Sequence, residues 1–293
     1  MSPWLQRLYV NTEQILLRKP MDLPEPNFLV IGGMRCATGW IRQCLKEHPQ
    51  VYLPQREPHF FDQNYEKGKE WWLAFFDGWR GEKAVGEKTA TYMCSEAAPG
   101  RIAEVNPDMK LVCCVRDPVE RMYSQYMMNR SESEDYREAG FEDLATPGGE
   151  YFQRSLYYTH VSNYLRYFPQ ENLLILVYED KDRDPYRFLG EIFRFIEVDP
   201  GFRPPSATVQ TKQGALEYSS TALNMASEVL LHPRSPRLVK RLYSGLRPKT
   251  PETDIDEKIY LDLGPHFADE IKGLEEILGR KLTCWRTRAY ADI

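Results

Sequence analysis

The hydrophobic pattern of the chain is dominated by three short, unbroken apolar runs, each followed by a segment with helical periodicity. Unbroken runs of strand length are typical of strands buried on both faces of a parallel sheet. A chain that alternates such strands with helices is expected to fold as an α/β protein. We therefore predict a three-layer sandwich with a central, mostly parallel sheet. The predicted strands cover residues 28–31, 111–115 and 173–178, and the predicted helices cover residues 38–46, 118–128 and 185–196.

Residues with strong positional preferences mark the ends of several elements. Asp117 precedes Pro118 at the start of the second helix, an order that suits an N-cap followed by a proline in the first turn. A last amphipathic helix is predicted over residues 265–279, with Gly279 as its C-cap. A further short strand is predicted around Val85, directly before Glu87-Lys88.

The rest of the pattern predicts the domain organisation. Residues 1–25 form an N-terminal leader that ends in a proline-rich stretch, and residues 26–293 form a single domain. Residues 130–150 are polar and predict a surface loop. Residues 232–256 contain four prolines and many basic residues, which predicts a mobile basic loop.

Composition narrows the class of protein. Of the 293 residues, 42% are hydrophobic and 28% are charged, as expected for a folded globular protein. The formal net charge of −5 disfavours broad nucleic-acid binding. The apolar runs are shorter than the roughly 20 residues that cross a bilayer, and charges interrupt the first twenty residues, where a signal peptide has an apolar core. We expect a cytoplasmic protein without a transmembrane segment, either a monomer or a homo-oligomer.

The six cysteines lack the spacing of a disulfide framework or of a zinc site. Cys113 and Cys114 are adjacent in an apolar run, and no CxxC motif occurs. We expect reduced thiols and no bound metal.

The loop after the first predicted strand is a candidate phosphate site. It begins at Gly32-Gly33 and leads into a helix, whose first N–H groups and dipole favour an anion. Arg35 adds a full positive charge and Thr38 adds a hydroxyl group. The segment does not match the GxxxxGK[ST] pattern of the P-loop. The alternative is an ordinary turn between a strand and a helix.

The loop after the second predicted strand is another candidate anion site. Arg116 stands at the end of the strand, where its guanidinium group can clamp a phosphate, and Ser124 follows about two helical turns later. The alternative is a capped helix with surface arginines. Ligands bind beyond the carboxyl ends of parallel strands, so we expect these two loops and the loop after the third predicted strand to converge on one crevice. A nucleotide with two separated phosphates, as in 3′-phosphoadenosine 5′-phosphosulfate (PAPS), explains both loops together.

Residues 28–45 followed by residues 116–124 resemble the PAPS-dependent sulfotransferase family. The likeness is greatest to its carbohydrate branch, of the heparan 3-O- and N-sulfotransferase type, and to its bacterial branch, and it implies the P-loop-like sulfotransferase fold. Three further segments are similar, and the resemblance as a whole covers about residues 26–198 and 257–286. These segments are residues 55–62 (QREPHFFD), 86–92 (GEKTATY) and 274–285 (LEEILGRKLTCW).

The first loop departs from the family pattern at three positions. Many relatives have Lys where Arg35 stands, and Arg keeps the charge without serving as a proton donor. Glycine is common in relatives where Cys36 and Ala37 stand, so we expect backbone strain if either residue adopts a positive φ angle.

The resemblance implies four catalytic residues. Glu57 is the predicted general base, and His59 is the alternative base or a donor to the transferring group. Lys88 is expected near Glu57 and the sulfuryl group, and Arg35 is expected to favour the leaving group. Three of them have a structural alternative: Glu57 paired with Arg56 in solvent, His59 in the core, and Lys88 in a surface pair with its neighbour in sequence, Glu87.

The resemblance also implies the residues that bind the donor. Arg116 and Ser124 are expected to hold the 3′-phosphate, with Tyr157 at its flank. Trp40 occupies the place of a tryptophan that stacks on adenine, and core packing is its alternative. The residues expected to bind the 5′-phosphate are Arg35, Cys36, Ala37, Thr38, Gly39 and Trp40.

The leading interpretation is an enzyme that transfers a sulfuryl group from PAPS to an acceptor hydroxyl by in-line displacement, releasing PAP, without a metal. A sugar hydroxyl is the first choice of acceptor, and an amine is a second. The alternatives are a polyketide, acyl or other small-metabolite hydroxyl, a P-loop kinase, for which Asp117 is the one weak Mg²⁺ ligand, and a nucleotide-binding scaffold.

Overall fold

The computed structural model describes residues 23–132, 136, 139–208 and 255–291. The chain divides into two compact units. The first contains Ala37–Val115, His160–Ala207 and the chain up to Gly33, and the second contains Met34–Cys36, Arg116–Thr159 and Thr208–Ile293. The prediction of a single domain over residues 26–293 remains a prediction.

Two predicted segments lie largely outside the described residues. They are the N-terminal leader, up to residue 22, and the basic loop, over residues 232–254.

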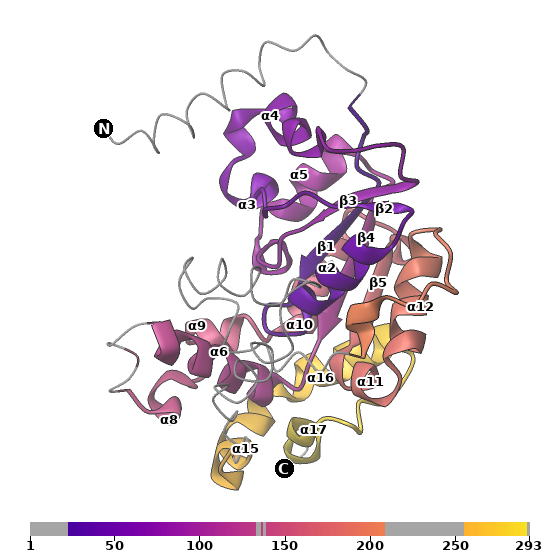
Figure 1. The fold of residues 1–293 in the computed structure, drawn as a ribbon. Helices are drawn as coiled ribbons and strands as arrows, with labels where there is room; N and C mark the ends of the chain where they lie inside the picture. The colour runs from indigo at the N-terminus through magenta and orange to yellow at the C-terminus, as the bar shows by residue number, and fades with distance from the viewer. Residues whose placement is uncertain (1–22, 133–135, 137–138, 209–254, 292–293) are drawn as a thin grey trace, which may run out of the picture. The chain divides into compact units, whose positions relative to one another are not determined.

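The first unit is built on a five-stranded, fully parallel sheet with the order β2-β3-β1-β4-β5 (Figure 1). Phe28 of the central strand is in register with Gly86 on one side and with Lys110 on the other. The strands are β1 (Phe28–Gly32), β2 (Val51–Tyr52), β3 (Ala84–Lys88), β4 (Lys110–Val115) and β5 (Leu173–Val177). The predicted parallel sheet is therefore confirmed.

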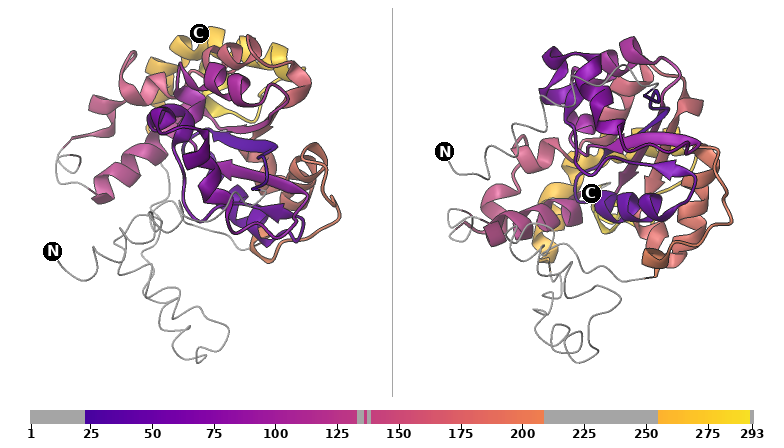
Figure 2. Two further views of the ribbon diagram at one scale, coloured as in Figure 1. Left: turned by 90° about the horizontal axis from the view of Figure 1, so that it is seen from above. Right: turned by 45° about the horizontal axis from the view of Figure 1, so that its top comes forward.

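Helices cover both faces of this sheet and complete a three-layer sandwich (Figure 2). Trp40 and Phe188 pack together across two of these helices, with ring centroids 5.9 Å apart. The helices are α2 (Thr38–Glu47), α3 (Phe60–Gln63), α4 (Lys69–Leu73), α5 (Ala98–Val105), α11 (Tyr178–Arg183) and α12 (Pro185–Phe195), with short 3₁₀ turns between them that include η1 (Tyr65–Lys67), η3 (Tyr92–Cys94) and η5 (Pro205–Ala207). The predicted helices over residues 38–46 and 185–196 are confirmed to within one residue.

The described part of the second unit is helical. Its helices are α6 (Pro118–Glu132), α8 (Phe141–Leu144), α9 (Glu150–Gln153), the start of α10 (Tyr157–Leu165), α15 (Glu257–Leu263), α16 (Ala268–Leu278) and α17 (Arg286–Tyr290). The prediction of a surface loop over residues 130–150 is wrong in part. Phe141 lies inside that stretch and is buried against Tyr123 and Tyr126, at centroid distances of 5.1 and 5.6 Å, so the chain forms a short helix around it.

Asp117 joins two parts of the second unit that are far apart in the sequence. Its carboxylate accepts hydrogen bonds from the N–H groups of Val119 and Glu120, which confirms it as the N-cap of α6. It also accepts hydrogen bonds from the N–H and hydroxyl groups of Thr287, at 2.7 and 2.6 Å. The carboxylate is fully buried, and burial raises its pKa. Asp117 therefore ties α17 to the start of α6.

Glu275 makes a second tie near the end of the chain. This buried carboxylate on α16 pairs with Lys281 and Arg288 and accepts a hydrogen bond from the Leu282 N–H group. Gly279 ends the helix with φ 64°, as predicted for its C-cap.

The remaining predictions concern cysteines and the membrane. All six cysteines are free thiols, and four of them are buried. Among the described residues, no helix is both long and apolar enough to span a bilayer. The cytoplasmic location remains a prediction.

Gly32 lies where β1 passes closest to the turn at residues 90–93. Its φ angle is 152°, and a Cβ atom there would be 2.6 Å from the Cβ of Met93 and 2.8 Å from the carbonyl oxygen of Ala90. Both distances are below van der Waals contact, so only glycine fits this position without displacing the turn.

We predict that Gly32→Ala lowers the free energy of unfolding by about 1–3 kcal/mol, because the added methyl group overpacks the end of β1. The matched control is Gly190→Ala within α12, where the nearest atom is 3.5 Å away. The control should be neutral or gain up to about 1 kcal/mol from helix propensity. Urea unfolding of both variants measures the difference, and equal stabilities would contradict the steric account.

Candidate functional site

Glu57 and Lys88 form an ion pair in the first unit. The Lys88 Nζ atom lies 2.5 Å from the Glu57 Oε1 atom, and the two side chains are 10% and 27% exposed. Lys88 is the last residue of β3, and Glu57 lies on the segment that leads into α3. The structure therefore brings these two predicted site residues together, and Glu57 pairs with Lys88 rather than with Arg56.

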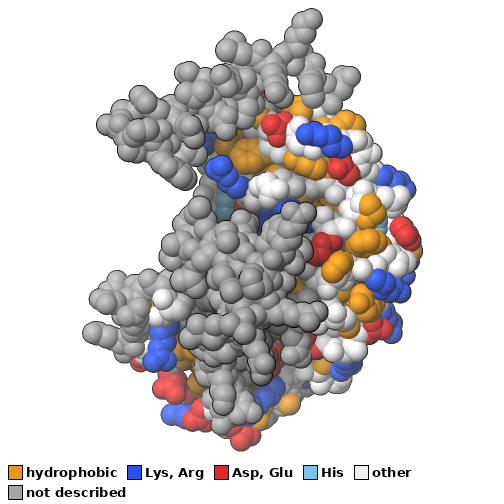
Figure 3. All heavy atoms as spheres, viewed as in Figure 1, with side chains coloured by type: hydrophobic (Ala, Val, Ile, Leu, Met, Phe, Trp, Pro, Cys, Tyr) orange, Lys and Arg blue, Asp and Glu red, His pale blue; other side chains and the backbone are white. Residues whose placement is uncertain are grey.

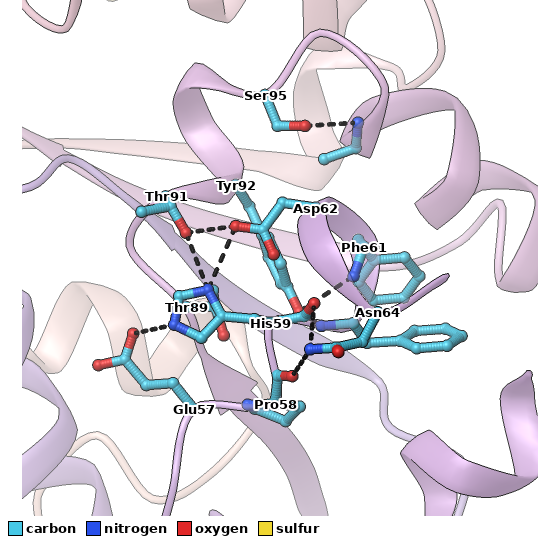
Figure 4. A network of polar contacts seen from close by, with 12 residues as sticks. Glu57, Pro58, His59, Phe61, Asp62, Asn64, Thr89, Thr91, Tyr92 and Ser95 are labelled. Carbon is cyan, nitrogen blue, oxygen red and sulfur yellow. Dashed lines mark hydrogen bonds and ion pairs between the residues drawn. The ribbon is translucent and has the colours of Figure 1, made fainter. Parts of the chain in front are cut away.

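His59 lies at the centre of a polar cluster beside this pair (Figure 4). Its Nε2 atom is 3.9 Å from Glu57, and its Nδ1 atom is 3.3 Å from both the Asp62 carboxylate and the Thr91 hydroxyl group. The Thr91 hydroxyl group also donates a 2.5 Å hydrogen bond to Asp62. The imidazole is partly exposed and carries polar partners, so the alternative of an inert core histidine does not describe it.

Asp62 and Thr91 are members of this cluster that sequence reasoning missed. Both stand inside the segments that carry the resemblance, and the i, i+3 spacing of His59 and Asp62 at the start of a helix was the available signal. The second carboxylate oxygen of Asp62 is buried and has no hydrogen-bond partner among the described residues.

Glu87 lies directly before Lys88 but points to the other side of β3, as neighbours on a strand do. It is fully buried and accepts hydrogen bonds from Trp72, Thr89 and Tyr92, at 2.9, 2.8 and 3.0 Å. Burial raises its pKa to about 7. The alternative of a surface pair between Glu87 and Lys88 is therefore wrong.

Arg35 and Ser124 meet in the second unit. The Arg35 Nε atom donates a 3.1 Å hydrogen bond to the Ser124 hydroxyl group, although the residues are 89 positions apart. Arg35 comes from the first predicted anion loop and Ser124 from the second. The structure thus joins one member of each loop within a single compact unit.

Arg116, Tyr157 and Cys36 lie in the same unit. The Arg116 guanidinium group is 2.9 Å from Glu120 and is largely buried. The Tyr157 hydroxyl group lies 3.7 Å from the Cys36 Sγ atom and hydrogen-bonds to the Arg116 backbone. Burial raises the pKa of Tyr157 well above its ordinary value, so its hydroxyl group stays protonated.

The backbone of the first loop adopts left-handed conformations at Arg35, with φ 65°, and at Ala37, with φ 61°. The expected strain therefore falls on Ala37 and Arg35 rather than on Cys36.

The first helical turn after this loop belongs to the first unit. It contains Thr38, Gly39 and Trp40, and Thr38 is buried. The Trp40 indole is 7% exposed and donates a 3.1 Å hydrogen bond to the Ser206 carbonyl oxygen. The Lys181 ammonium group lies 5.4 Å from its ring. The convergence of both loops on one crevice remains a prediction.

The first unit also presents a partly exposed aromatic surface at α4. Apolar side chains gather there next to basic ones (Figure 3). Trp71 packs edge-on against Phe75 at 4.9 Å, and the Lys67 ammonium group lies 4.4 Å from the Trp71 ring. This surface combines a flat apolar ring with a nearby positive charge.

Among the described residues, no three His, Cys, Asp or Glu side chains are grouped closely enough to hold a metal ion. Asp117, the one Mg²⁺ ligand considered from the sequence, uses its oxygens to cap α6 and to hold Thr287. No observation on the described residues favours the kinase alternative.

Comparisons with known proteins agree with the sequence resemblance. Residues 25–213 match the family model of the sulfotransferase domain. The chain is 32% identical over 181 residues to human heparan sulfate glucosamine 3-O-sulfotransferase 3B1, covering 58% of this chain and 46% of that protein. It is 31% identical over 236 residues to human heparan sulfate glucosamine 3-O-sulfotransferase 6, covering 76% of this chain and 69% of that protein.

Two further matches bear on the family and the fold. The mouse bifunctional heparan sulfate N-deacetylase/N-sulfotransferase 4 is 30% identical over 198 residues, covering 60% of this chain and 23% of that protein. The crystal structure of a sulfotransferase from Alicyclobacillus acidocaldarius superposes with a TM-score of 0.68 at 22% identity, covering 90% of this chain and all of that one. The chain spans about half the length of several curated relatives it matches.

We predict that stability falls as the pH rises from about 4.5 to about 7, because Glu87 ionises near pH 4.5 in the unfolded chain but near pH 7 in the folded protein. The contribution of Glu87 to the free energy of unfolding is fully present below pH 4.5 and is lost between pH 4.5 and about pH 7. It amounts to at most about 3 kcal/mol. Glu87→Gln keeps an accepting oxygen without the ionisation, so its stability should depend less on pH. Urea unfolding at several pH values measures both slopes, and identical slopes would show that Glu87 does not titrate in this range.

Proposed function

Because this chain belongs to the sulfotransferase family, we propose that it is an enzyme that transfers a sulfuryl group from PAPS to an acceptor hydroxyl group. The observation that carries this proposal is the hydrogen bond between Arg35 and Ser124. This hydrogen bond joins the two segments that the resemblance assigns to the two phosphates of PAPS. It places the Arg35 guanidinium group next to the Ser124 hydroxyl group. A doubly phosphorylated nucleotide needs such groups for both of its anionic ends.

The residues proposed to bind this donor are those of the two predicted anion loops, together with Tyr157. Arg116 and Ser124 bind the 3′-phosphate, and Tyr157 supports Arg116 through its backbone. Arg35 and the backbone N–H groups of residues 36–40 bind the 5′-phosphate and favour departure of the leaving group.

The first unit holds the residues proposed to act on the acceptor. The acceptor oxygen attacks sulfur in line, the bond from sulfur to the phosphate oxygen of the donor breaks, and Glu57 takes the hydroxyl proton. Lys88 lies within an ion-pair distance of Glu57 and can stabilise charge on the sulfuryl oxygens. His59 lies beside both and is the second candidate for the base.

A carbohydrate hydroxyl is the acceptor that we propose. It is supported by the relatives named as heparan sulfate glucosamine 3-O-sulfotransferases. The aromatic surface at Trp71 with its attached Lys67 also suits a sugar ring that carries acidic groups. An amine is the second candidate, because one relative is named as an N-sulfotransferase.

We predict that Glu57→Gln lowers kcat by roughly 10²–10⁴-fold, because the variant loses the general base. PAP binding should persist, since the donor is assigned to other residues. The matched control is Glu191→Gln on α12, a partly exposed carboxylate that pairs with Arg187 of the same helix, and this variant should keep normal turnover. A sulfuryl-transfer assay with PAPS and heparan-type oligosaccharides measures this, and near-normal turnover of Glu57→Gln would exclude Glu57 as the base.

We predict that Arg116→Ala weakens PAP binding by about 2–3 kcal/mol, because a charged phosphate contact is lost. Arg116→Lys should recover part of this affinity by restoring the charge without the planar fork. Arg187→Ala, on the exposed side of α12, is the control and should bind PAP normally. Isothermal titration calorimetry gives the affinities, and unchanged binding by Arg116→Ala would refute the 3′-phosphate assignment.

A further inference from the structure

The start of α3 lacks the cap that a helix normally receives from its own N-cap residue. The N-cap is His59, whose backbone is left-handed, with φ 50° and ψ 37°, and whose side chain makes no capping hydrogen bond. The first helical N–H groups, of Phe60 and Phe61, therefore need a partner from elsewhere. The Tyr92 hydroxyl group supplies it, accepting hydrogen bonds from both at 2.8 and 3.3 Å.

The Tyr92 hydroxyl group is held in place by Glu87. With both acceptor positions of its oxygen used by α3, the hydroxyl hydrogen is directed to the Glu87 Oε1 atom, 3.0 Å away. The indole N–H group of Trp72 donates to the same oxygen, and the Thr89 hydroxyl group donates to the other. Both Glu87 and Tyr92 are fully buried, so water cannot replace any of these bonds.

This arrangement has a consequence for His59. Because Tyr92 caps α3, the imidazole is not needed for capping and instead faces Glu57 and Asp62. A left-handed backbone at a non-glycine residue is strained and persists only where its surroundings impose it. The hydrogen bonds from Phe60 and Phe61 to Tyr92 supply that constraint immediately after His59.

The same buried group also fixes the partner of Glu57. Glu87 and Lys88 are consecutive residues of β3, so the strand that anchors Tyr92 also carries the Lys88 ammonium group. The buried Glu87 carboxyl group therefore helps to position both members of the Glu57–Lys88 ion pair. It is connected to Lys88 through β3 and to the segment that carries Glu57 through Tyr92 and α3.

We propose that Tyr92, oriented by Glu87, is a positioning residue that substitutes for the N-cap of α3 and thereby aligns Glu57 and His59 for proton removal from the acceptor. The inference rests on the proposed function for the chemical role of Glu57, while the capping role stands on the hydrogen bonds alone.

The first test is Tyr92→Phe, which removes only the capping oxygen. It should lower kcat by about 10- to 100-fold and change the KM for PAPS by less than about threefold, because misplacement of a catalytic group affects the chemical step. The matched control is Tyr164→Phe, which removes another buried hydroxyl group, one that bonds to the Tyr92 carbonyl oxygen. The control should be less stable to heat but keep its kcat, and an equal loss of kcat in both variants would overturn the proposal.

A double-mutant cycle separates positioning from general destabilisation. In a Glu57→Gln background, Tyr92→Phe should cause less than a threefold further loss of kcat, because the group that it aligns is already absent. A merely structural role would reduce kcat by the same factor in both backgrounds, and that result would overturn the proposal.

Amide hydrogen exchange tests the cap without reference to catalysis. Tyr92→Phe should speed exchange at Phe60 and Phe61 by at least tenfold, while Tyr164→Phe should leave these two amides unchanged. If Glu57→Gln keeps normal turnover, the assignment of the base fails, and the cap is then judged by exchange alone. Unchanged exchange at both amides in Tyr92→Phe would overturn the cap whatever the identity of the base.

Discussion

The first unit depends on one buried carboxylate. Glu87, the next-to-last residue of β3, is removed from water, and its buried carboxyl group is tolerated there because three donors surround it. Those donors come from α4, from the residue directly after β3 and from η3. Satisfying Glu87 therefore fixes the relative positions of three segments that are otherwise connected by irregular chain. The polar cluster around His59 is built on this arrangement.

The second unit also contains a buried carboxylate that accepts hydrogen bonds from separate segments. Asp117 is also a fully buried carboxylate, and its partners are the start of α6 and, 170 positions after Asp117, Thr287 of α17. Since α6 carries Ser124, the segment near the end of the chain contributes to holding the helix that contacts Arg35. In both units, a buried acid fixes segments that carry the charged groups of the candidate site.

The elements of the fold were largely predictable from the sequence, and the polar cluster was only partly so. Unbroken apolar runs and the Asp117-Pro118 start signal depend on local chemistry, so periodicity finds them directly. The two-residue strand β2 is too short to produce a pattern, and the helix at Phe141 depends on one apolar anchor in a polar stretch. Nothing in the sequence indicated that Glu87 is buried, and a surface pair with Lys88 stood as an alternative, because burial of an acid depends on donors such as Trp72 that are distant in sequence.

The residue at position 35 is an arginine, and this determines how the positive charge beside Ser124 depends on pH. A guanidinium group retains its proton at every pH at which proteins remain folded, unlike the lysine ammonium group. The cation that contacts Ser124 is thus constant in charge, and it offers several N–H groups in a rigid plane. Acidity of the medium cannot switch this group off, so any response of turnover to acid or alkali has to originate at other side chains.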